Sequence, residues 1–517
     1  MASTISRREF LKRSGTAASV AGAGAPLVMN LVPSSALAGT TSGYKALVCV
    51  FLAGGNDAYN TVIRTDRGLQ RFVAARETVS REVLTVDGGS IAPKLALALS
   101  AAQNRTSIAG LSLALHPALS NIKQLIEQGR MAVIGNAGPL AAPTTATAYL
   151  NGTVAVPPKL FSHNDQTSMW QSGQPEGATS GWGGELVRRF AETNLINGQA
   201  SQLFSAVAME STPVFCAGTS AKMPDAKPVV APFGASRAGG ALRPGGLEQD
   251  PAGGPTAPYL IRWAIDREVA LPPLFAGTVG RGEGTVAGVS ANHLIEQDYV
   301  KKLNSANEAW KASSKAMAGV SNSVPVPAGN SLAEQLAVVA RLIKSSGNTP
   351  LSLGRQVFFV QLGGFDTHSG QVGSESPHLK LLRQLDDALK FFDDELGADR
   401  SKVVTFTASE FGRKLNENGD GTDHGWGGHH FVMGGSVQGG AYGYFPDLSS
   451  WNDATRSYGD SQVLPDGTLV PSVPVDLIAK ELGKWMGIDW SNASNAKVGA
   501  QLFPGLSAST PLLGFAA

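Results

Sequence analysis

Carboxylate side chains follow three apolar runs of strand length in this sequence. The three segments that hold them are Gly54–Asp57, Gly363–His368 and Ala408–Arg413. Ligands in open α/β sheets bind beyond the carboxyl ends of the strands, and glycine there lets the backbone turn sharply and approach a ligand. Neutral imidazole and carboxylate groups suit zinc, manganese or iron. The sequence therefore predicts a site for a divalent metal, with these candidate ligands: Asp57, Asp366, His368 and Glu410.

The spacing within the second segment and the segment Thr422–His430 support this hypothesis. Asp366 and His368 are two residues apart, so on an extended chain both side chains point to the same side and can reach one ion. The segment Thr422–His430 adds Asp423 and three histidines shortly after the third strand. Each pair by itself is also compatible with an ordinary solvated turn.

A hydroxyl group is the second chemical candidate. Ser162 precedes a short predicted helix and falls at its N-cap. Serine is common there as a simple capping residue. It could equally be a nucleophile activated by a metal or by the helix N-terminus. The sequence leaves both roles open, and it does not separate Ser162 from a neighbour such as Thr167 as the nucleophile.

Composition excludes several classes of protein. The chain has 517 residues, a net charge of +1 and two cysteines, so it has neither a disulfide framework nor a cysteine-rich metal site. Near-neutral charge gives no electrostatic basis for binding nucleic acid. The sequence has no G-x-S-x-G elbow, H-E-x-x-H, Walker A or strand-linked G-x-G-x-x-G motif. These absences disfavour an α/β-hydrolase triad, a zincin, a P-loop NTPase and a dinucleotide enzyme.

Strand and helix patterns alternate along most of the chain. Strands are predicted at 45–52, 131–135, 203–209, 356–362 and 403–407, and helices at 116–129, 183–190, about 290–318, 331–345, 376–396 and 474–486. The first strand, the first helix and the second strand are interpreted as a βαβ unit. This alternation predicts an α/β fold with a mostly parallel sheet between helices on both faces.

The first 38 residues are interpreted as an export signal. Ser6–Lys12 contains paired arginines before Phe-Leu-Lys, a weakly apolar stretch follows, and Ala36-Leu37-Ala38 is typical of a cleavage site. This pattern predicts a twin-arginine signal and a partnership with the twin-arginine translocase. The cleaved protein would reach the periplasm or the exterior without stable membrane insertion. Residues 39–517 are expected to form one α/β domain with a Gly/Pro-rich insertion at about 217–258.

The motifs together resemble the family of exported bacterial proteins known as domain of unknown function 1501. The resemblance covers the chain after the signal and rests on these segments: Phe51–Asn60, Ser162-His163, Trp170–Gly173, Gly181–Gly183, Gly364–His368, Ser409–Arg413 and Thr422–Gly425. That family is more distantly similar to the alkaline phosphatase and sulfatase superfamily. The resemblance implies a three-layer α/β fold, one or two divalent metal ions, and hydrolysis or transfer of phosphate or sulfate esters.

The resemblance also implies roles for individual residues. Asp57 resembles the metal aspartate of the first strand, and Ser162 the nucleophile at a helix start. Asp366 and His368 look like ligands of one metal position, and Glu410 occupies the place of a strand-end aspartate. A late histidine among His424, His429 and His430 would complete the set, and His424 is preferred. Arg413 could hold a substrate oxyanion or close a salt bridge.

Two departures from the superfamily pattern are visible. Phe411 stands where a histidine or asparagine is usual, so a second metal position would lack a ligand. Neither Cys49 nor Cys216 lies in the sequence that sulfatases convert to formylglycine.

We therefore expect an exported, metal-dependent hydrolase of small or polymeric phosphate or sulfate esters. The alternative is a non-catalytic envelope protein that keeps the scaffold. A third possibility is a protein whose metal is purely structural.

Overall fold

The computed structural model describes residues 43–192, 205–209, 213–218, 315–348, 354–373, 375–492 and scattered positions from 495 to 516. The chain divides into two units, Met1–Ser42 and Gly43–Ala517, and all described residues belong to the second. The expected export signal lies outside the described residues, as does nearly all of the expected insertion. The same is true of most of the helix expected at 290–318.

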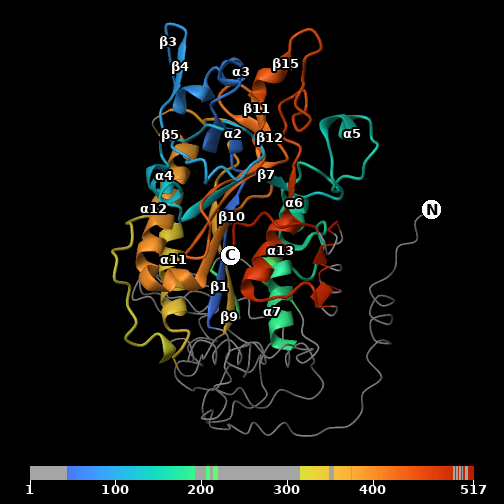
Figure 1. The fold of residues 1–517 in the computed structure, drawn as a ribbon. Helices are drawn as coiled ribbons and strands as arrows, with labels where there is room; N and C mark the ends of the chain where they lie inside the picture. Colours follow the sequence, from blue (N-terminus) through green and yellow to red (C-terminus); the bar gives the residue numbers. More distant parts are fainter. Residues whose placement is uncertain are drawn as a thin grey trace, which may run out of the picture. The chain divides into compact units, whose positions relative to one another are not determined.

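A central sheet of eight strands organises the fold (Figure 1). Its strands are β1 (Lys45–Ala53), β7 (Met131–Gly138), β8 (Ala206–Ala208), β9 (Arg355–Gly363), β10 (Val403–Ala408), β13 (Gly428–Gly434), β14 (Gly440–Gly443) and β17 (Val473–Pro474). The order is β14-β7-β13-β10-β1-β9-β8, with β17 also paired to β7. Only β13 runs antiparallel to its neighbours β10 and β7 within this sheet, so the sheet is mostly parallel.

Two apolar cores lie on opposite faces of the sheet, and β1 contributes to both. Val48, Val50 and Leu52 belong to one core, whereas Leu47 and Phe51 belong to the other. This alternation follows from the two-residue period of a strand. The first core packs under α4 (Ser120–Glu127), α11 (Ser331–Lys344) and α12 (Pro377–Leu396), and the second under α7 (Trp182–Glu192) and α13 (Val475–Met486). Figure 1 shows these two groups of helices on either side of the sheet.

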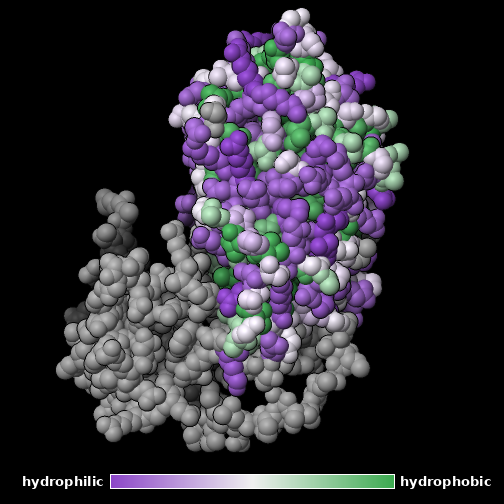
Figure 2. All heavy atoms as spheres, turned by 90° about the vertical axis from the view of Figure 1, so that its left-hand side faces the viewer, coloured by the Kyte–Doolittle hydropathy of each residue, from purple (hydrophilic) through white to green (hydrophobic). Residues whose placement is uncertain are grey.

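Local sequence signals explain the limits of the long helix α12. The side chain of Ser376 accepts the backbone N–H of Leu379, Pro377 occupies the first turn, and Gly397 follows the helix with φ of 51°. Apolar residues of the helix face the core, whereas Lys380, Arg383 and Asp387 are exposed. Figure 2 shows the molecular face on this side, where hydrophilic surface predominates among the described residues.

Most of the smaller elements lie beyond the carboxyl ends of the central strands. The small sheets are β2 (Val62–Arg64) with β6 (Leu113–Leu115) and β5 (Ala96–Leu97), β3 (Leu84–Asp87) with β4 (Ser90–Pro93), β11 (Arg413–Glu417) with β12 (Thr422–His424), and β15 (Trp451–Asn452) with β16 (Ser457–Tyr458). The short helices are α2 (Ala58–Thr61), α3 (Leu69–Ala75), α5 (Ala146–Leu150), α6 (His163–Ser172), η1 (Val79–Glu82), η2 (Val214–Cys216), η4 (Gly397–Lys402) and η5 (Leu448–Ser450). Two of them lie elsewhere, since η4 precedes β10 and η2 packs against one face of the sheet.

The predicted fold class is confirmed: an α/β protein with a central, mostly parallel sheet and helices on both faces. The interpretation of the first strand, helix and second strand needs one correction. Strands β1 and β7 are parallel, but β10 and β13 lie between them, so they do not form an adjacent βαβ pair. Strand β13 was not predicted, and its Gly428-His429-His430 segment was considered only as a source of ligands.

None of the described helices is long and apolar enough to cross a membrane.

Candidate metal centre

The loops that follow three adjacent parallel strands meet at one edge of the sheet. Strand β1 pairs with both β9 and β10, so the segments after Ala53, Gly363 and Ala408 emerge side by side. A Cβ on Gly54, whose φ is 120°, would lie 2.3 Å from the backbone nitrogen of Asp366. Only glycine permits this approach, because it lacks a Cβ and tolerates a positive φ. The strand-end segments that the sequence singled out are therefore in contact.

Three side chains converge at this edge: His163, Asp366 and His424. Each offers a ligand atom within 4.8 Å of the other two. Nε2 of His424 lies 3.2 Å from Oδ1 of Asp366, and Nε2 of His163 lies 3.5 Å from Oδ2 of the same carboxylate. Two imidazoles and one carboxylate are a usual ligand set for a catalytic divalent metal. Asp366 and His424 were predicted as ligands, whereas His163 was not.

The orientation of His163 is set by Glu410. Nδ1 of His163 lies 2.8 Å from Oε1 of Glu410, whose side chain is buried. A carboxylate accepts a hydrogen bond, so in the neutral ring Nδ1 carries the proton and Nε2 presents its lone pair to Asp366. The hydrogen bond to Glu410 raises the pKa of His163, against the opposing effect of partial burial. Metal-bound histidines commonly have such an outer carboxylate partner.

His424 is oriented in the same manner by the backbone. Its Nδ1 lies 2.8 Å from the carbonyl oxygen of Phe161, which leaves Nε2 to face Asp366. Phe161 has a φ of 73°, a rare conformation for a residue that is not glycine. Burial lowers the pKa of His424, and the bond to the Phe161 carbonyl opposes that effect only in part. The neutral imidazole, which is the form that binds metal, is thereby favoured.

His368, which the sequence predicts as a ligand together with Asp366, stands next to this group. Its Nε2 lies 3.2 Å from Oδ1 of Asp366 and 2.8 Å from Nε2 of His424. Its Nδ1 is 3.4 Å from Oδ1 of Asp423. The position allows His368 to act as a fourth ligand or to bind a group held by the other three.

Glu410 lies behind the histidine rather than among the metal-binding atoms. Its Oε1 accepts the backbone N–H of Gly54 at 2.8 Å as well as the proton of His163. Its Oε2 lies 3.3 Å from the hydroxyl of Ser409. These bonds occupy Oε1, so the contacts of Glu410 favour a role in positioning His163 over the expected role as a direct ligand.

Asp57 was expected to bind the metal, but its contacts do not support that role. Its buried carboxylate accepts bonds from both terminal nitrogens of Arg76, at 2.6 and 2.9 Å, and from Gln371 and the N–H of Asn60. Burial works to raise the pKa of Asp57, but Arg76 and Gln371 outweigh it and leave the pKa lowered. Asp57 is thus a structural ion pair and N-cap of α2, and no oxygen remains for a metal.

Arg413 closes a salt bridge and is not available to hold a substrate oxyanion. The side chain is fully buried and donates to the backbone oxygens of these residues: Gly54, Gly55, Phe365 and Thr422. It also lies 2.6 Å from Oδ1 of Asp366. The guanidinium joins the three strand-end loops and orients the exposed carboxylate of Asp366. Burial works to raise the pKa of Asp366, but Arg413 outweighs it and the pKa is lowered.

Phe411 forms an apolar wall behind the two histidines. Its ring centroid lies 4.9 Å from that of His163 and 4.5 Å from that of His424. The residue that replaces the superfamily's usual histidine or asparagine therefore packs against the ligands and adds none.

Ser162 does not cap α6 with its side chain. Its hydroxyl instead donates to Oδ2 of Asp165 at 2.9 Å. Ser162 immediately precedes His163 in the chain. The simple capping role is thus contradicted, while the role of nucleophile is not tested.

His429 and His430 lie in β13 and are both buried. Nδ1 of His429 accepts the backbone N–H of Asn136 at 3.0 Å. Burial lowers the pKa of His429 to about 4 and that of His430 to about 3. Of His424, His429 and His430, only His424 belongs to the group with His163 and Asp366 among the described residues. His424 is also the histidine that the resemblance favours.

A sequence signal for His163 did exist. It adjoins Ser162 in a motif that had been noted for the serine alone. Its role depends on contact with Glu410, 247 residues further along the chain, which spacing alone does not reveal.

A family model described as "Protein of unknown function (DUF1501)" matches residues 348–458. This part of the chain contains Asp366, His368, Glu410 and His424, so the resemblance to that family is confirmed there. No curated protein matches the chain.

Solved structures show only weak similarity. The C-terminal periplasmic domain of EcEptC from Escherichia coli, in complex with Zn, gives 7% identity and a TM-score of 0.30, with 92% of this chain and 88% of that chain covered. The lipoteichoic acid synthase LtaP from Listeria monocytogenes gives 8% identity and a TM-score of 0.26, with 82% of this chain and 74% of that chain covered. Ps i-CgsB in complex with k-i-k-neocarrahexaose gives 8% identity and a TM-score of 0.29, with 78% of this chain and 68% of that chain covered.

Proposed function

We propose that this protein is an exported, metal-dependent hydrolase of phosphate or sulfate esters. The residues that would hold the metal are His163, Asp366 and His424, with His368 beside them. One observation carries the proposal: both histidines use Nδ1 for a hydrogen bond to Glu410 or to the Phe161 carbonyl, so both Nε2 atoms face one carboxylate. This donor set fits zinc, manganese or iron.

The exposure of the ligands favours catalysis over a structural metal. The side chains of His163, Asp366 and His424 are 35%, 46% and 21% exposed. Structural zinc sites are closed by four protein ligands, whereas catalytic sites keep an open position. A divalent cation in such a site stabilises the negative charge of a transferring phosphoryl or sulfuryl group and lowers the pKa of water.

Ser162 is the proposed nucleophile. Its Oγ would form a bond to phosphorus or sulfur as the bond to the leaving oxygen breaks. Its proton would pass to Asp165, whose Oδ2 accepts a hydrogen bond from Oγ at 2.9 Å, and from there to the leaving oxygen. Water would then release the acid and restore the hydroxyl. Direct attack by water is the alternative, and replacement of Ser162 distinguishes the two.

The proposed location rests on the paired arginines Arg7 and Arg8. Replacement of both by lysine should retain the protein in the cytoplasm of a host with a twin-arginine translocase. Unchanged export of that variant would contradict the proposed route.

A metal assay followed by a panel of phosphate and sulfate mono- and diesters tests the activity. The wild-type protein should hold about one or two equivalents of metal, and Asp366→Ala should lose both metal and hydrolysis. Asp453→Ala, which changes an exposed carboxylate near Trp451, serves as the control. A full metal load in Asp366→Ala would contradict the assignment.

Variants of the hydroxyl groups give a second comparison. Ser162→Ala should abolish turnover but keep the metal, whereas Thr167→Ala should keep both. A wild-type protein with neither metal nor esterase activity would favour the non-catalytic envelope protein instead.

A further inference from the structure

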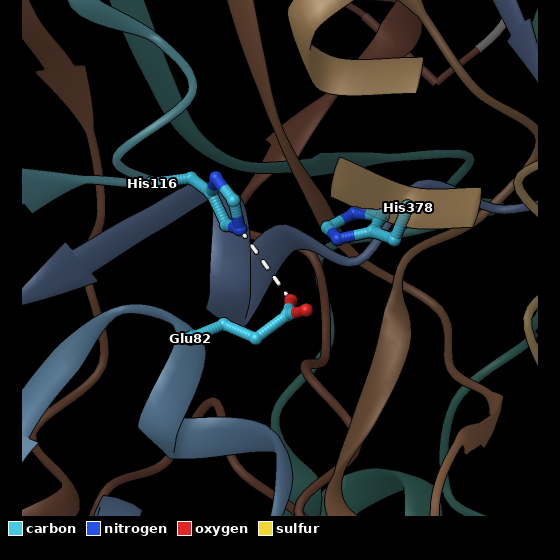
Figure 3. A group of neighbouring side chains, drawn as sticks. All are labelled: Glu82, His116 and His378. Atoms are coloured by element: carbon cyan, nitrogen blue, oxygen red, sulfur yellow. Dashed lines mark hydrogen bonds and ion pairs between the residues drawn. The ribbon is translucent and has the colours of Figure 1, made fainter. Parts of the chain in front are cut away.

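A second group of side chains of metal-binding types shares no residue with the site described above. Glu82, His116 and His378 each offer a ligand atom within 4.8 Å of the other two. They come from η1, the segment after β6 and the first turn of α12. Figure 3 shows the two imidazole rings and the carboxylate turned toward a common space.

His378 has a buried nitrogen atom without a partner. Its side chain is fully buried, and its Nε2 lies 3.3 Å from Oδ1 of Asn56, an acceptor that fixes the proton on Nε2. Nδ1 therefore carries a lone pair, and no hydrogen-bond partner for it exists among the described residues. An unsatisfied buried polar atom is costly, and an outer partner on the second nitrogen is typical of a metal-binding histidine.

Glu82 has a nearly buried carboxylate that forms no ion pair with a Lys or Arg side chain among the described residues. The side chain is 9% exposed. Oε1 accepts the hydroxyl of Ser376 at 3.0 Å, and Oε2 lies 3.5 Å from Nε2 of His116.

His116 holds Glu82 in place. Its Nδ1 accepts the backbone N–H of Ala118 at 3.1 Å, so the ring proton resides on Nε2 and points to Oε2 of Glu82. That proton prevents Nε2 from binding a metal unless it moves. We therefore treat His116 as a positioning residue and not as a ligand.

A cavity of about 400 Å³ opens beside Glu82. Glu82 and His116 line it, together with Arg81, Lys94 and Pro117, whereas His378 is not among the lining residues. On the Glu82 side, the cavity has room for the water molecules that would complete the coordination of an ion.

We propose that Glu82 and the Nδ1 atom of His378 bind a divalent cation, zinc or manganese, with His116 orienting the carboxylate. The ion would join η1 to the first turn of α12. Through the bond between His378 and Asn56, it would also stabilise the loop after β1 that contacts the first metal centre. This second site does not depend on the proposed hydrolase activity.

Metal stoichiometry tests the proposal in a background without the first site. The full chain carrying Asp366→Ala and His424→Ala, equilibrated with zinc, should retain about one equivalent. Adding either Glu82→Gln or His378→Gln should remove it. His430→Gln is the matched control, since His430 also has a buried Nδ1 without a partner among the described residues but belongs to no metal-binding group found there. Metal content unchanged by Glu82→Gln and His378→Gln would overturn the proposal.

The role of His116 and the location of the ion need separate measurements. His116→Ala should raise the dissociation constant for zinc roughly 10- to 100-fold without changing the stoichiometry. An unchanged constant would contradict the positioning role. Anomalous diffraction from wild-type crystals equilibrated with manganese requires no variant, and it should place an ion between Glu82 and His378. Absence of that peak at full occupancy of the first site would also overturn the proposal.

Discussion

Nδ1 of His163 donates to the buried carboxylate of Glu410 across 2.8 Å, and this contact links a helix start to the end of a central strand. Glu410 is itself held by the N–H of Gly54 and by Ser409. These two contacts fix the carboxylate independently of the imidazole that it orients. The contact decides which histidine nitrogen faces Asp366.

Replacement of Glu410 by Gln should weaken metal binding without removing any ligand. The loss of the carboxylate charge should lower the pKa of His163 from its raised value, since the bond to Glu410 is the main cause of that shift. Outer partners of metal-bound histidines contribute roughly 10- to 100-fold in affinity. Competition with a zinc chelator measures this change, and NMR titration of metal-free protein measures the pKa. Glu375→Gln, at an exposed position, is the control, and equal affinities would contradict the role given to Glu410.

Replacement of Asp57 by Asn should destabilise the fold but leave the metal in place. The change leaves the buried Arg76 guanidinium without its counter-charge, and breaking a buried ion pair costs about 3–5 kcal/mol. Denaturant unfolding measures the loss, and metal analysis of the folded fraction should give the wild-type content. Asp366→Asn should lose the metal, and it should destabilise the fold less than Asp57→Asn because its salt bridge to Arg413 is half-exposed on the carboxylate side. A stable Asp57→Asn protein without metal would restore Asp57 as a ligand.

Replacement of Gly55 by Ala should disturb both histidine ligands. Gly55 has a φ of 83°, and a Cβ there would lie 2.3 Å from Cε2 of Phe411, whose ring packs against His163 and His424. We expect a loss of stability of about 1–3 kcal/mol together with weaker zinc binding. Gly88→Ala also has a positive φ but meets no atom within 4 Å, so it should lose stability only. Identical effects of the two changes on zinc affinity would contradict this account.

Stability should decline at mildly acidic pH because of buried histidines. Burial lowers the pKa of His378 and His430 to about 3 and that of His429 to about 4. The unfolded chain binds protons near pH 6.5, whereas the folded chain does not, so stability is fully present above that pH. It should fall as the pH is lowered toward 4, by up to about 1.4 kcal/mol per pH unit for each histidine.

The variant His430→Gln should remove one histidine's share of this slope. Urea unfolding of metal-free protein between pH 4 and pH 7 compares the two chains. The control is Gly88→Ala, which changes no ionisable side chain, so its slope should match that of the wild type. An unchanged slope in His430→Gln would show that His430 does not contribute to acid unfolding.

The sequence was sufficient to predict the layered fold, because continuous apolar strands and helical spacing are local patterns. It also predicted that the segments after β1, β9 and β10 would meet, since parallel strands end at a common edge. Strand β13 was missed because its glycines and histidines do not form a strand pattern. Its pairing with β10 and β7 decides its structure.

Residue types in the sequence determined that imidazole and carboxylate would be available for a metal and thiolate would not. Only the tertiary structure decided which groups converge. Asp57 and Asp366 both follow a strand end, yet one is neutralised by Arg76 in the core and the other is exposed beside two histidines. The physical reason is that metal binding requires a free lone pair. Whether a lone pair is free depends on partners distant in sequence, such as Glu410 for His163 and Phe161 for His424.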